Sequence, residues 1–345
     1  MKLESARVLR LGILAGAILG TVLGVWRLIE GASAPDALLW ALGGFAIVLL
    51  LAALSALGIR LQRSDVPKPV LLAAIAIAAH PLQALAQAPG RAAADAAPVA
   101  IGETFTIPSR VLGESRRINV YRPPGYADSS AVALPVLYMP DGGIGEDFLH
   151  VAGLVQVSVG NGTMRPFLLV GIENTARRRD LTGPTGNADN RKIAPVVGGS
   201  AAFRRFIRAE LMPAIGGRYR TTGESAIVGE SLAGLFVVET LLLEPDLFDT
   251  YIAFDPSLWW NDGELVERAA GSAAALARRR VYLASSGQAD IAALTQRLAD
   301  AIAARAPAGA TLHYEAMPEE SHATIYHPAA LRAFRRLFAP VPPAR

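Results

Sequence analysis

Six residues in the second half of the chain have the types and spacing for nucleophilic chemistry. They read GESLAG at positions 229–234, after the apolar run Ala226–Val228 and before the apolar stretch Leu235–Leu242. A strand, a sharp turn, a serine and a helix form the context that exposes a serine hydroxyl as a nucleophile. Small residues suit so tight a turn, and the N-terminus of the following helix favours negative charge beside the serine. The alternative is a plain Gly-Ser loop, because Ala233 stands where such strings usually have their second glycine.

A serine nucleophile needs a base, and histidine is the usual one because its pKa lies near neutrality. Of the five histidines, His322 and His327 lie between the last predicted strand, 312–316, and the last predicted helix, 328–338. His322 is favoured, because His327 directly precedes Pro328 and is expected to open the helix. The remaining histidines are assigned to an apolar N-terminal segment, to a helix before the nucleophile and to a strand: His80, His150 and His313.

The acid that would orient the imidazole is predicted to be Asp290. It follows the predicted strand 281–284 and lies between Ser231 and His322 in chain order. An aspartate at this position is also a good helix N-cap, so a purely structural role stays open. Asp255, after the predicted strand 251–254, is the main rival. Two weaker alternatives are the loop residues Glu319 and Glu320.

Negative charge on a reacting carbonyl oxygen must be stabilised by two backbone N–H groups. One is expected from Leu232, the residue after the nucleophile. The other is expected from Gly143, in the turn after the predicted strand 136–139, because glycine lets the backbone approach closely. The alternative for this turn, Asp141–Gly143, is a turn without a role in chemistry.

Short apolar runs alternate with helical stretches from about residue 101 onward. Such alternation predicts an α/β fold whose mostly parallel sheet carries helices on both faces. Helices are predicted at 201–211, 290–304 and 328–338. Strands are predicted at 118–121, 133–139, 167–172, 226–228, 251–254, 281–284 and 312–316.

The N-terminal part of the chain is predicted to interact with a membrane. Residues 11–29 are almost wholly apolar, and residues 37–59 contain no charged side chain. The second stretch is long enough to cross about 30 Å of hydrocarbon. A third apolar stretch, 69–88, ends in alternating alanines that resemble a signal-peptidase site. The alternative for this third stretch is an apolar linker.

Lys2, Arg7 and Arg10 precede the first apolar stretch, and basic residues at 60, 63 and 68 follow the second. These positive charges predict a cytoplasmic location for the two outer ends of a hairpin. The third stretch then carries the catalytic domain outward, which predicts a bacterial inner-membrane protein with its domain in the periplasm or outside the cell. The expected organisation is a membrane-spanning helical hairpin, a third hydrophobic segment that is signal-like or an anchor, a linker and the catalytic domain: 1–66, 67–88, 89–100 and 101–340.

Composition excludes several kinds of site. The chain has no cysteine, so it has no disulfide, cysteine nucleophile or thiolate metal site. Its formal net charge of +3 comes from scattered arginines and not from a basic tract with interleaved aromatic residues, so a nucleic-acid partner is not indicated. The predicted serine chemistry requires neither a metal nor an organic cofactor. The oligomeric state cannot be read from these features.

Over residues 101–340 the chain resembles the serine esterases of the α/β-hydrolase fold, a group that includes enterobactin and salmochelin esterases and esterase D-like enzymes. Five segments carry the resemblance: Val136–Gly142, Val170–Thr182, Phe206–Tyr219, Ile227–Leu235 and Phe248–Trp260. The resemblance implies Ser231 as nucleophile, His322 as base and Asp290 as acid, with Leu232 and Gly143 at the oxyanion. The chain departs from the family pattern at Glu230, Ala233 and Asp255, and the first and last of these alter the charge near the site.

The expected function is hydrolysis of a carboxylic ester through an acyl-enzyme. The resemblance to siderophore esterases suggests a catecholate or another trilactone as substrate, bound with the help of Arg179, Trp259 and Trp260. Paired tryptophans also occur as core or lid packing, so this role stays open. The alternatives are acyl transfer at the same site, and a membrane-anchored binding protein that has kept the fold without catalysis.

Overall fold

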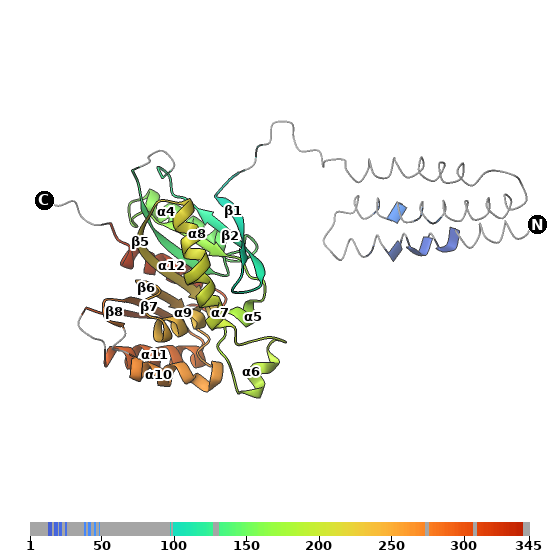
Figure 1. Ribbon diagram of the computed structural model, residues 1–345. Coiled ribbons are helices and arrows are strands. Elements are labelled where there is room, and N and C mark those ends of the chain that lie inside the picture. The colour runs from blue at the N-terminus through green and yellow to red at the C-terminus, as the bar shows by residue number, and fades with distance from the viewer. Residues whose placement is uncertain are drawn as a thin grey trace, which may run out of the picture. The chain divides into compact units, whose positions relative to one another are not determined.

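The computed structural model describes residues 97, 99–126, 131–272, 276–305 and 309–340, together with scattered residues between 13 and 48 (Figure 1). The chain divides into two compact units, residues 1–97 and residues 98–345. The described residues between 13 and 48 are helical. Of the three predicted apolar membrane segments, 69–88 lies wholly outside the described residues, and only scattered residues of 11–29 and 37–59 lie within them. Within the described part of the chain, no helix combines the length and the apolar character needed to span a membrane.

The described residues of the second unit form one eight-stranded mixed sheet. Its strand order is β1-β2-β4-β3-β5-β6-β7-β8. The pairs β1–β2 and β2–β4 are antiparallel, and all pairs from β4 to β8 are parallel. The strands are β1 (Glu103–Ser109), β2 (Glu114–Tyr121), β3 (Leu134–Pro140), β4 (Leu168–Ile172), β5 (Thr221–Glu230), β6 (Thr250–Phe254), β7 (Arg280–Ser286) and β8 (Thr311–Met317).

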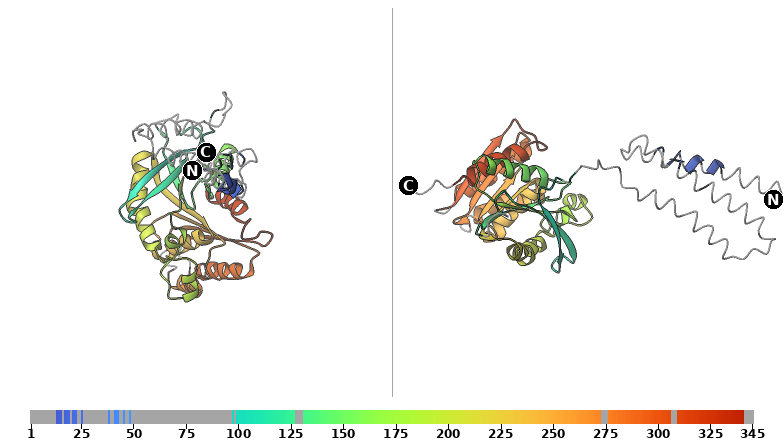
Figure 2. Two further views of the ribbon diagram at one scale, coloured as in Figure 1. Left: turned by 90° about the vertical axis from the view of Figure 1, so that its right-hand side faces the viewer. Right: turned by 90° about the horizontal axis from the view of Figure 1, so that it is seen from above.

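Helices cover both faces of the sheet, as Figure 2 shows from above. One core cluster packs α4 (Phe148–Gly160) and α12 (Tyr326–Leu337) against one face. The other core cluster packs the remaining long helices against the opposite face. These and the shorter helices are α5 (Arg177–Asp180), α6 (Ala188–Lys192), α7 (Ser200–Phe206), the π-helical turn η1 (Ile207–Leu211), α8 (Met212–Arg218), α9 (Ser231–Leu243), the 3₁₀ turn η2 (Trp260–Gly263), α10 (Glu264–Ser272) and α11 (Ala289–Ala303).

The predicted α/β architecture with helices on both faces is therefore confirmed, and each predicted strand is present. The structure adds β1, which the sequence analysis missed because its side chains are mostly polar and exposed. The helix predicted at 201–211 continues through the π-helical turn into α8 and ends at Arg218. Since β3 to β8 are parallel, their carboxyl ends lie along one edge of the sheet, where an α/β fold places its ligand sites.

The turn from β5 to α9 requires very close approach of backbone atoms. A Cβ atom at Gly229 would lie 2.6 Å from the carbonyl carbon of Ala233, and one at Gly234 would lie 3.0 Å from the carbonyl oxygen of Phe254. Ala233 itself is fully buried within this crossing. The small residues of the 229–234 string are thus required by packing, and alanine is tolerated at position 233.

We expect Gly229→Ala to destabilise the fold by about 1–3 kcal/mol, because its Cβ would overlap backbone that cannot move independently. Gly216→Ala is the matched control: it lies in α8, and an added Cβ would meet no atom within 4 Å. This control should gain about 0.5–1 kcal/mol from helix propensity. Urea unfolding measures both changes, and equal midpoints for Gly229→Ala and wild type would contradict the packing argument.

Candidate functional site

Ser231 lies at the sharp turn between β5 and α9. Its backbone adopts φ = 59°, a left-handed conformation that is costly for a residue with a side chain. This conformation directs the hydroxyl toward the loop after β8, where Ser231 Oγ lies 3.0 Å from His322 Nε2. The predicted strand-turn-helix context of this serine is confirmed.

His322 lies in the loop between β8 and α12, and it contacts two partners through its two ring nitrogens. Its Nδ1 atom lies 3.0 Å from Asp255 Oδ2. Since an ionised carboxylate only accepts, Nδ1 carries the proton and donates it to Asp255, which leaves Nε2 free to accept from the serine hydroxyl. His327 instead belongs to α12 and packs its ring 5.5 Å from that of His150.

Asp255 reaches His322 because β6 is the immediate neighbour of β5. The two strands are parallel, with Glu230 paired to Phe254, so the residue after β6 lies beside the residue after β5. Asp255 adopts φ = 39° and is fully buried. Its other oxygen, Oδ1, accepts a hydrogen bond of 2.6 Å from the Ser286 amide at the end of β7. Asp255, Ser231 and His322 thus form a continuous hydrogen-bonded chain.

Asp290, the predicted acid, does not lie at this site. It is exposed in the first turn of α11, beyond the end of β7. The nitrogen of His322 that an acid would orient is already bonded to Asp255. Chain order did not decide between the two aspartates, because both lie between Ser231 and His322, whereas the sheet order places the end of β6, and not that of β7, next to the nucleophile strand. The rival weighed in the sequence analysis, Asp255, has the required geometry.

The two partners of this hydrogen bond stabilise each other's charged forms. Burial alone would raise the pKa of Asp255, but the hydrogen bonds from His322 and Ser286 outweigh it and lower this pKa. The hydrogen bond to Asp255 raises the pKa of His322, burial opposes the rise, and the charge of Glu230 adds to it. Asp255 is thus ionised over the neutral pH range, and it favours the imidazolium that forms when the serine loses its proton.

Glu230 brings a second carboxylate to the same imidazole. Its Oε1 atom lies 3.2 Å from His322 Nδ1. The Nδ1 proton is bonded to Asp255, and Glu230 Oε1 is buried without a hydrogen-bond partner. From the sequence, Glu230 is recognisable as a departure from the family pattern that alters the charge near the site, but its contact with His322 is not predicted.

Of the two amides predicted to stabilise an oxyanion, Leu232 has the expected setting. It is the second residue of α9, where backbone N–H groups have no acceptor within the helix. The Gly143 amide differs, because it donates a hydrogen bond of 2.7 Å to Glu146 Oε2. Asn174 Nδ2 holds the other oxygen of Glu146 at 2.9 Å. The Gly143 amide therefore already has an acceptor, which the local sequence did not reveal.

Arg179, a predicted substrate-binding residue, is engaged by carboxylates of the protein itself. Its guanidinium bonds Asp180 Oδ1 at 2.7 Å and Glu114 Oε1 at 2.7 Å. These hydrogen bonds, the one to Asp180 above all, raise the pKa of Arg179 further above its ordinary value. Arg179 thus fastens α5 to β2, and it is not available to an anionic substrate. The pairing with Glu114 was not predicted, because Glu114 is remote from Arg179 in the sequence.

The two predicted tryptophans differ in their surroundings. Trp260 is buried, with 3% of its surface exposed, and its Nε1 donates to the Gly183 carbonyl at 3.1 Å. It is a packing residue, the alternative that the sequence analysis had left open. Trp259 is 37% exposed. It lies two residues after Ser257, whose hydroxyl oxygen lies 3.5 Å from Ser231 Oγ. Since Trp260 is buried, Trp259 alone of the pair is exposed to a ligand.

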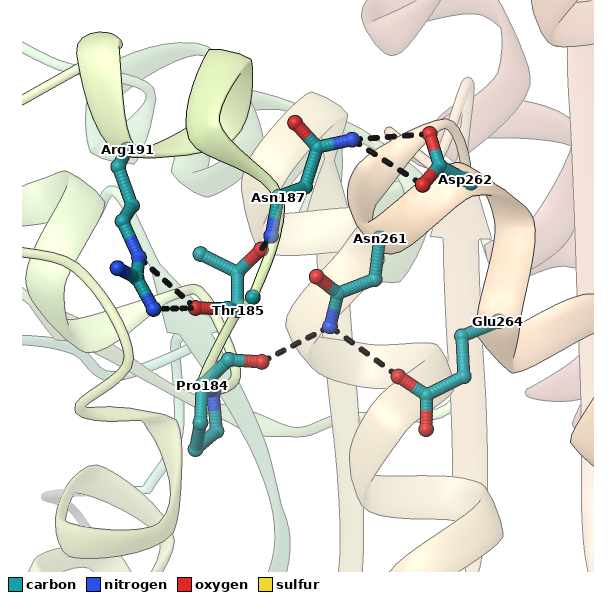
Figure 3. Close-up of a pocket in the computed structure, with 8 residues that line it drawn as sticks. Pro184, Thr185, Asn187, Arg191, Asn261, Asp262 and Glu264 are labelled. Atoms are coloured by element: carbon teal, nitrogen blue, oxygen red, sulfur yellow. Dashed lines mark hydrogen bonds between the residues drawn. The ribbon is translucent and has the colours of Figure 1, made fainter.

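A polar pocket of about 710 Å³ lies between the segment before α6 and the turn η2 (Figure 3). Its lining does not include Ser231, His322 or Asp255. Its polar groups mostly bind one another: Asn187 Nδ2 bonds both oxygens of Asp262, and Asn261 Nδ2 bonds the Pro184 carbonyl and Glu264. These bonds fasten residues 184–191 to η2, so we assign this pocket a structural role. Among the described residues, no cluster of three or more His, Cys, Asp or Glu side chains could hold a metal ion.

Comparison with known proteins agrees with this geometry. The family described as Putative esterase matches residues 109–328, a segment that contains Ser231, Asp255 and His322. The chain belongs to this family. Among solved structures, an IroE-like serine hydrolase from Shewanella oneidensis is 31% identical with a TM-score of 0.59, and the match covers 69% of this chain and 80% of that one. The BES protein from Bacillus cereus superposes with a TM-score of 0.63 at 20% identity, covering 72% of this chain and 100% of that one, which shows a shared fold.

Several curated proteins that are similar to this chain are named as siderophore esterases. Ferri-bacillibactin esterase BesA of Bacillus subtilis is 41% identical over 114 residues, which are 31% of this chain and 37% of BesA. Iron(III) salmochelin esterase of Escherichia coli is 23% identical over 165 residues, which are 46% of this chain and 36% of that protein. The matched regions thus span little more than a third of each relative's length.

One signal in the sequence does point to Asp255. Strands that follow one another along the chain are neighbours in the sheet about two-thirds of the time. The strand that ends before Asp255 comes next after the nucleophile strand, whereas the strand that ends before Asp290 is one further along. No comparable signal indicates that Glu146 occupies the Gly143 amide, because that contact depends on the conformation of the turn.

We expect Asp255→Asn to slow covalent labelling of Ser231 by a fluorophosphonate probe about 10²-fold or more, because the amide no longer holds the Nδ1–H tautomer or offsets the imidazolium charge. Asp290→Asn is the matched control and should stay within about twofold of wild type, because its side chain is exposed and away from His322. Labelling rates over a range of probe concentrations measure both. If Asp290→Asn is labelled slowly and Asp255→Asn at the wild-type rate, the acid is Asp290 and not Asp255.

Proposed function

We propose that the chain is a serine carboxylic-ester hydrolase that works through an acyl-enzyme. The proposal rests on two consecutive contacts of 3.0 Å each. One joins Ser231 Oγ to His322 Nε2, and the other joins His322 Nδ1 to Asp255 Oδ2. A nucleophile, a base and an orienting acid in this order define the serine-hydrolase mechanism on unrelated folds. Membership of the esterase family supports carboxylic esters as the substrates.

In the proposed acylation step, His322 Nε2 takes the proton of Ser231 as Oγ attacks the ester carbonyl. Asp255 stabilises the resulting imidazolium, and the Leu232 amide with the positive end of α9 stabilises the oxyanion. The Gly143 amide can donate to the oxyanion only after the Glu146 carboxylate leaves it. His322 then protonates the departing alcohol, and in the second half of the cycle it activates the water that releases the acid.

We further propose ester-linked siderophores as the substrate class. The relatives that support this choice are a ferri-bacillibactin esterase, a triacetylfusarinine C esterase and a salmochelin esterase. Trp259 presents an exposed indole on the same loop as Ser257, and such a ring can stack on an aromatic acyl group. With Arg179 paired internally and Trp260 buried, Trp259 is the one predicted substrate residue kept in the proposal.

Ser231→Ala tests the mechanism. We expect the variant to fold normally and to lose hydrolysis of a short-chain activated ester by about 10³-fold or more, because the nucleophile is absent. Wild-type protein should also hydrolyse members of a panel of ferric and iron-free trilactone siderophores, assayed by chromatography of the released acids. A Ser231→Ala variant within about tenfold of wild type would exclude this mechanism.

We also propose that residues 101–340 face away from the cytoplasm and are tethered by the N-terminal segments. The distribution of positive charge around residues 11–29 and 37–59 supports this topology. Alkaline phosphatase fused after Arg345 should then be active in cells, because this reporter requires export. A fusion that is active only as a cytoplasmic reporter would refute the topology, and a fusion to residues 101–345 alone serves as the cytoplasmic control.

A further inference from the structure

Glu230 occupies an unusual position for a carboxylate. It is the last residue of β5, directly before Ser231, and its register partner on β6 is Phe254, directly before Asp255. The two acids therefore extend from neighbouring strand ends toward one imidazole nitrogen, with Asp255 Oδ2 at 3.0 Å and Glu230 Oε1 at 3.2 Å from His322 Nδ1. One N–H group thus faces two acceptors.

The single proton on Nδ1 leaves one acceptor unsatisfied. It bonds Asp255, and Glu230 Oε1 remains buried without a hydrogen-bond partner. The Glu230 side chain is only 15% exposed. A buried polar atom without a partner costs free energy, so its persistence beside the catalytic histidine requires a reason. Packing alone supplies none, because an apolar side chain of similar size would fill the same space without this cost.

The charges that face Glu230 come from several elements. His322 and Arg177 favour its ionised form, whereas Asp255 and Asp147 oppose it. Arg177 binds Asp141 through its Nε and Nη2 atoms, at 2.8 and 2.7 Å, and its positive charge acts on Glu230 from there. Burial dominates and raises the pKa of Glu230 to about 8. The group is therefore mostly protonated at neutral pH and ionises as the pH rises through this value.

We propose that Glu230 is a second positioning carboxylate for His322: it accepts the Nδ1–H when Asp255 is lost, and in its ionised form it adds to the stabilisation of the imidazolium. The inference rests on the proposed hydrolase function. Glu230 acts on the Nδ1 side of the ring, whereas Ser231 and the oxyanion lie on the Nε2 side. Its charge is thus closer to the imidazolium than to the oxyanion that it would repel.

This arrangement makes His322 and Glu230 titrate as a coupled pair. As the pH rises, the imidazole loses its proton beside a carboxyl group that is itself ionising, so two steps are expected. Removal of the Glu230 charge should lower the pKa of His322, because one source of its elevation disappears. The kcat of the wild type should keep rising to a higher pH than the kcat of a Glu230→Gln variant. The kcat of the variant should level off at a lower pH and at a lower value.

The direct test follows the ring signals of His322 by NMR as a function of pH, with His322→Gln used to assign them. In Glu230→Gln we expect one titration step, displaced to lower pH by about half a unit or more. The matched control is Glu319→Gln, which removes a carboxylate from the same loop as His322; because Glu319 is 56% exposed, solvent screens its charge and the titration should not move. Superimposable titrations for wild type and Glu230→Gln would overturn the inference. This measurement needs no substrate, so it decides the point even if ester hydrolysis fails.

The second test compares kcat and KM in wild type, Glu230→Gln, Asp255→Asn and the double variant. Glu230→Gln should lower kcat more than about threefold at pH 9 with little change in KM, and less at pH 6, where Glu230 is protonated. In the Asp255→Asn background, Glu230→Gln should lower kcat by a larger factor than in the wild-type background, because no carboxylate then remains at Nδ1. An equal or smaller loss of kcat in the Asp255→Asn background would show that Glu230 does not replace Asp255 at His322 Nδ1.

Stability gives an independent check that the variants fold and that the Glu230 carboxyl is buried. Its pKa in the folded chain is raised to about 8, above the ordinary value of 4.5. The folded state therefore loses stability as the pH rises from the lower value through the higher one. Glu230→Gln should match the wild type in melting temperature at pH 5 and exceed it at pH 9, whereas a lower melting temperature at both pH values would assign Glu230 a packing role only.

Discussion

The hydrogen bond between Asp255 and His322 is the interaction on which the organisation of the site depends. It joins the end of β6 to the loop after β8, and the Ser286 amide at the end of β7 holds the same carboxylate from its other side. Three parallel strand ends therefore converge on one side chain. The imidazole is thereby fixed so that its other nitrogen meets Ser231 Oγ at the end of β5. A shift in the register of any of these strands would break this chain of contacts.

Local sequence was sufficient to predict Ser231 and His322. A serine elbow is encoded by its immediate neighbours, since small residues at Gly229 and Gly234 allow the backbone crossing that exposes the hydroxyl. His322 was found by elimination and by its place in a loop before the last helix. The succession of apolar runs also predicted the α/β fold, because buried parallel strands are apolar whatever their neighbours are.

The remaining assignments depended on contacts between side chains and strands that local sequence does not specify. Asp255 and Asp290 both follow apolar strands; the order of strands along the chain favours Asp255, and the order in the sheet decides for it. Arg179 could not be recognised as internally paired without its partner Glu114 on β2, and Trp260 could not be recognised as buried without the Gly183 carbonyl. The amide of Gly143 is occupied through the turn conformation that brings Glu146 back to it. Each of these errors concerned a partner and not a residue type.

The two acids beside His322 show how surroundings decide the behaviour of one functional group. Asp255 accepts from a backbone amide and from the imidazole, and these bonds lower its pKa in spite of burial. Glu230 has no comparable donor, and burial raises its pKa to about 8. Hydrogen bonds thus keep one carboxylate charged while desolvation keeps its neighbour neutral near pH 7. The pair supplies a permanent charge and a pH-dependent one at the same nitrogen.

The attachment of the 183–191 segment to η2 has a consequence for how the surface of this part of the molecule can diversify. Trp260 donates to the main-chain carbonyl of Gly183. Asn261 donates to that of Pro184 (Figure 3). Every residue carries such a carbonyl, so these two bonds do not specify which side chains the segment displays. Asn187 adds a side-chain bond to Asp262, so its identity matters, but evolution or a mutagenesis library can change side chains of the segment that make no such bond while these two attachments persist. Such changes leave the positions of Ser231, His322 and Asp255 untouched, because none of these three residues lines the pocket beside the segment.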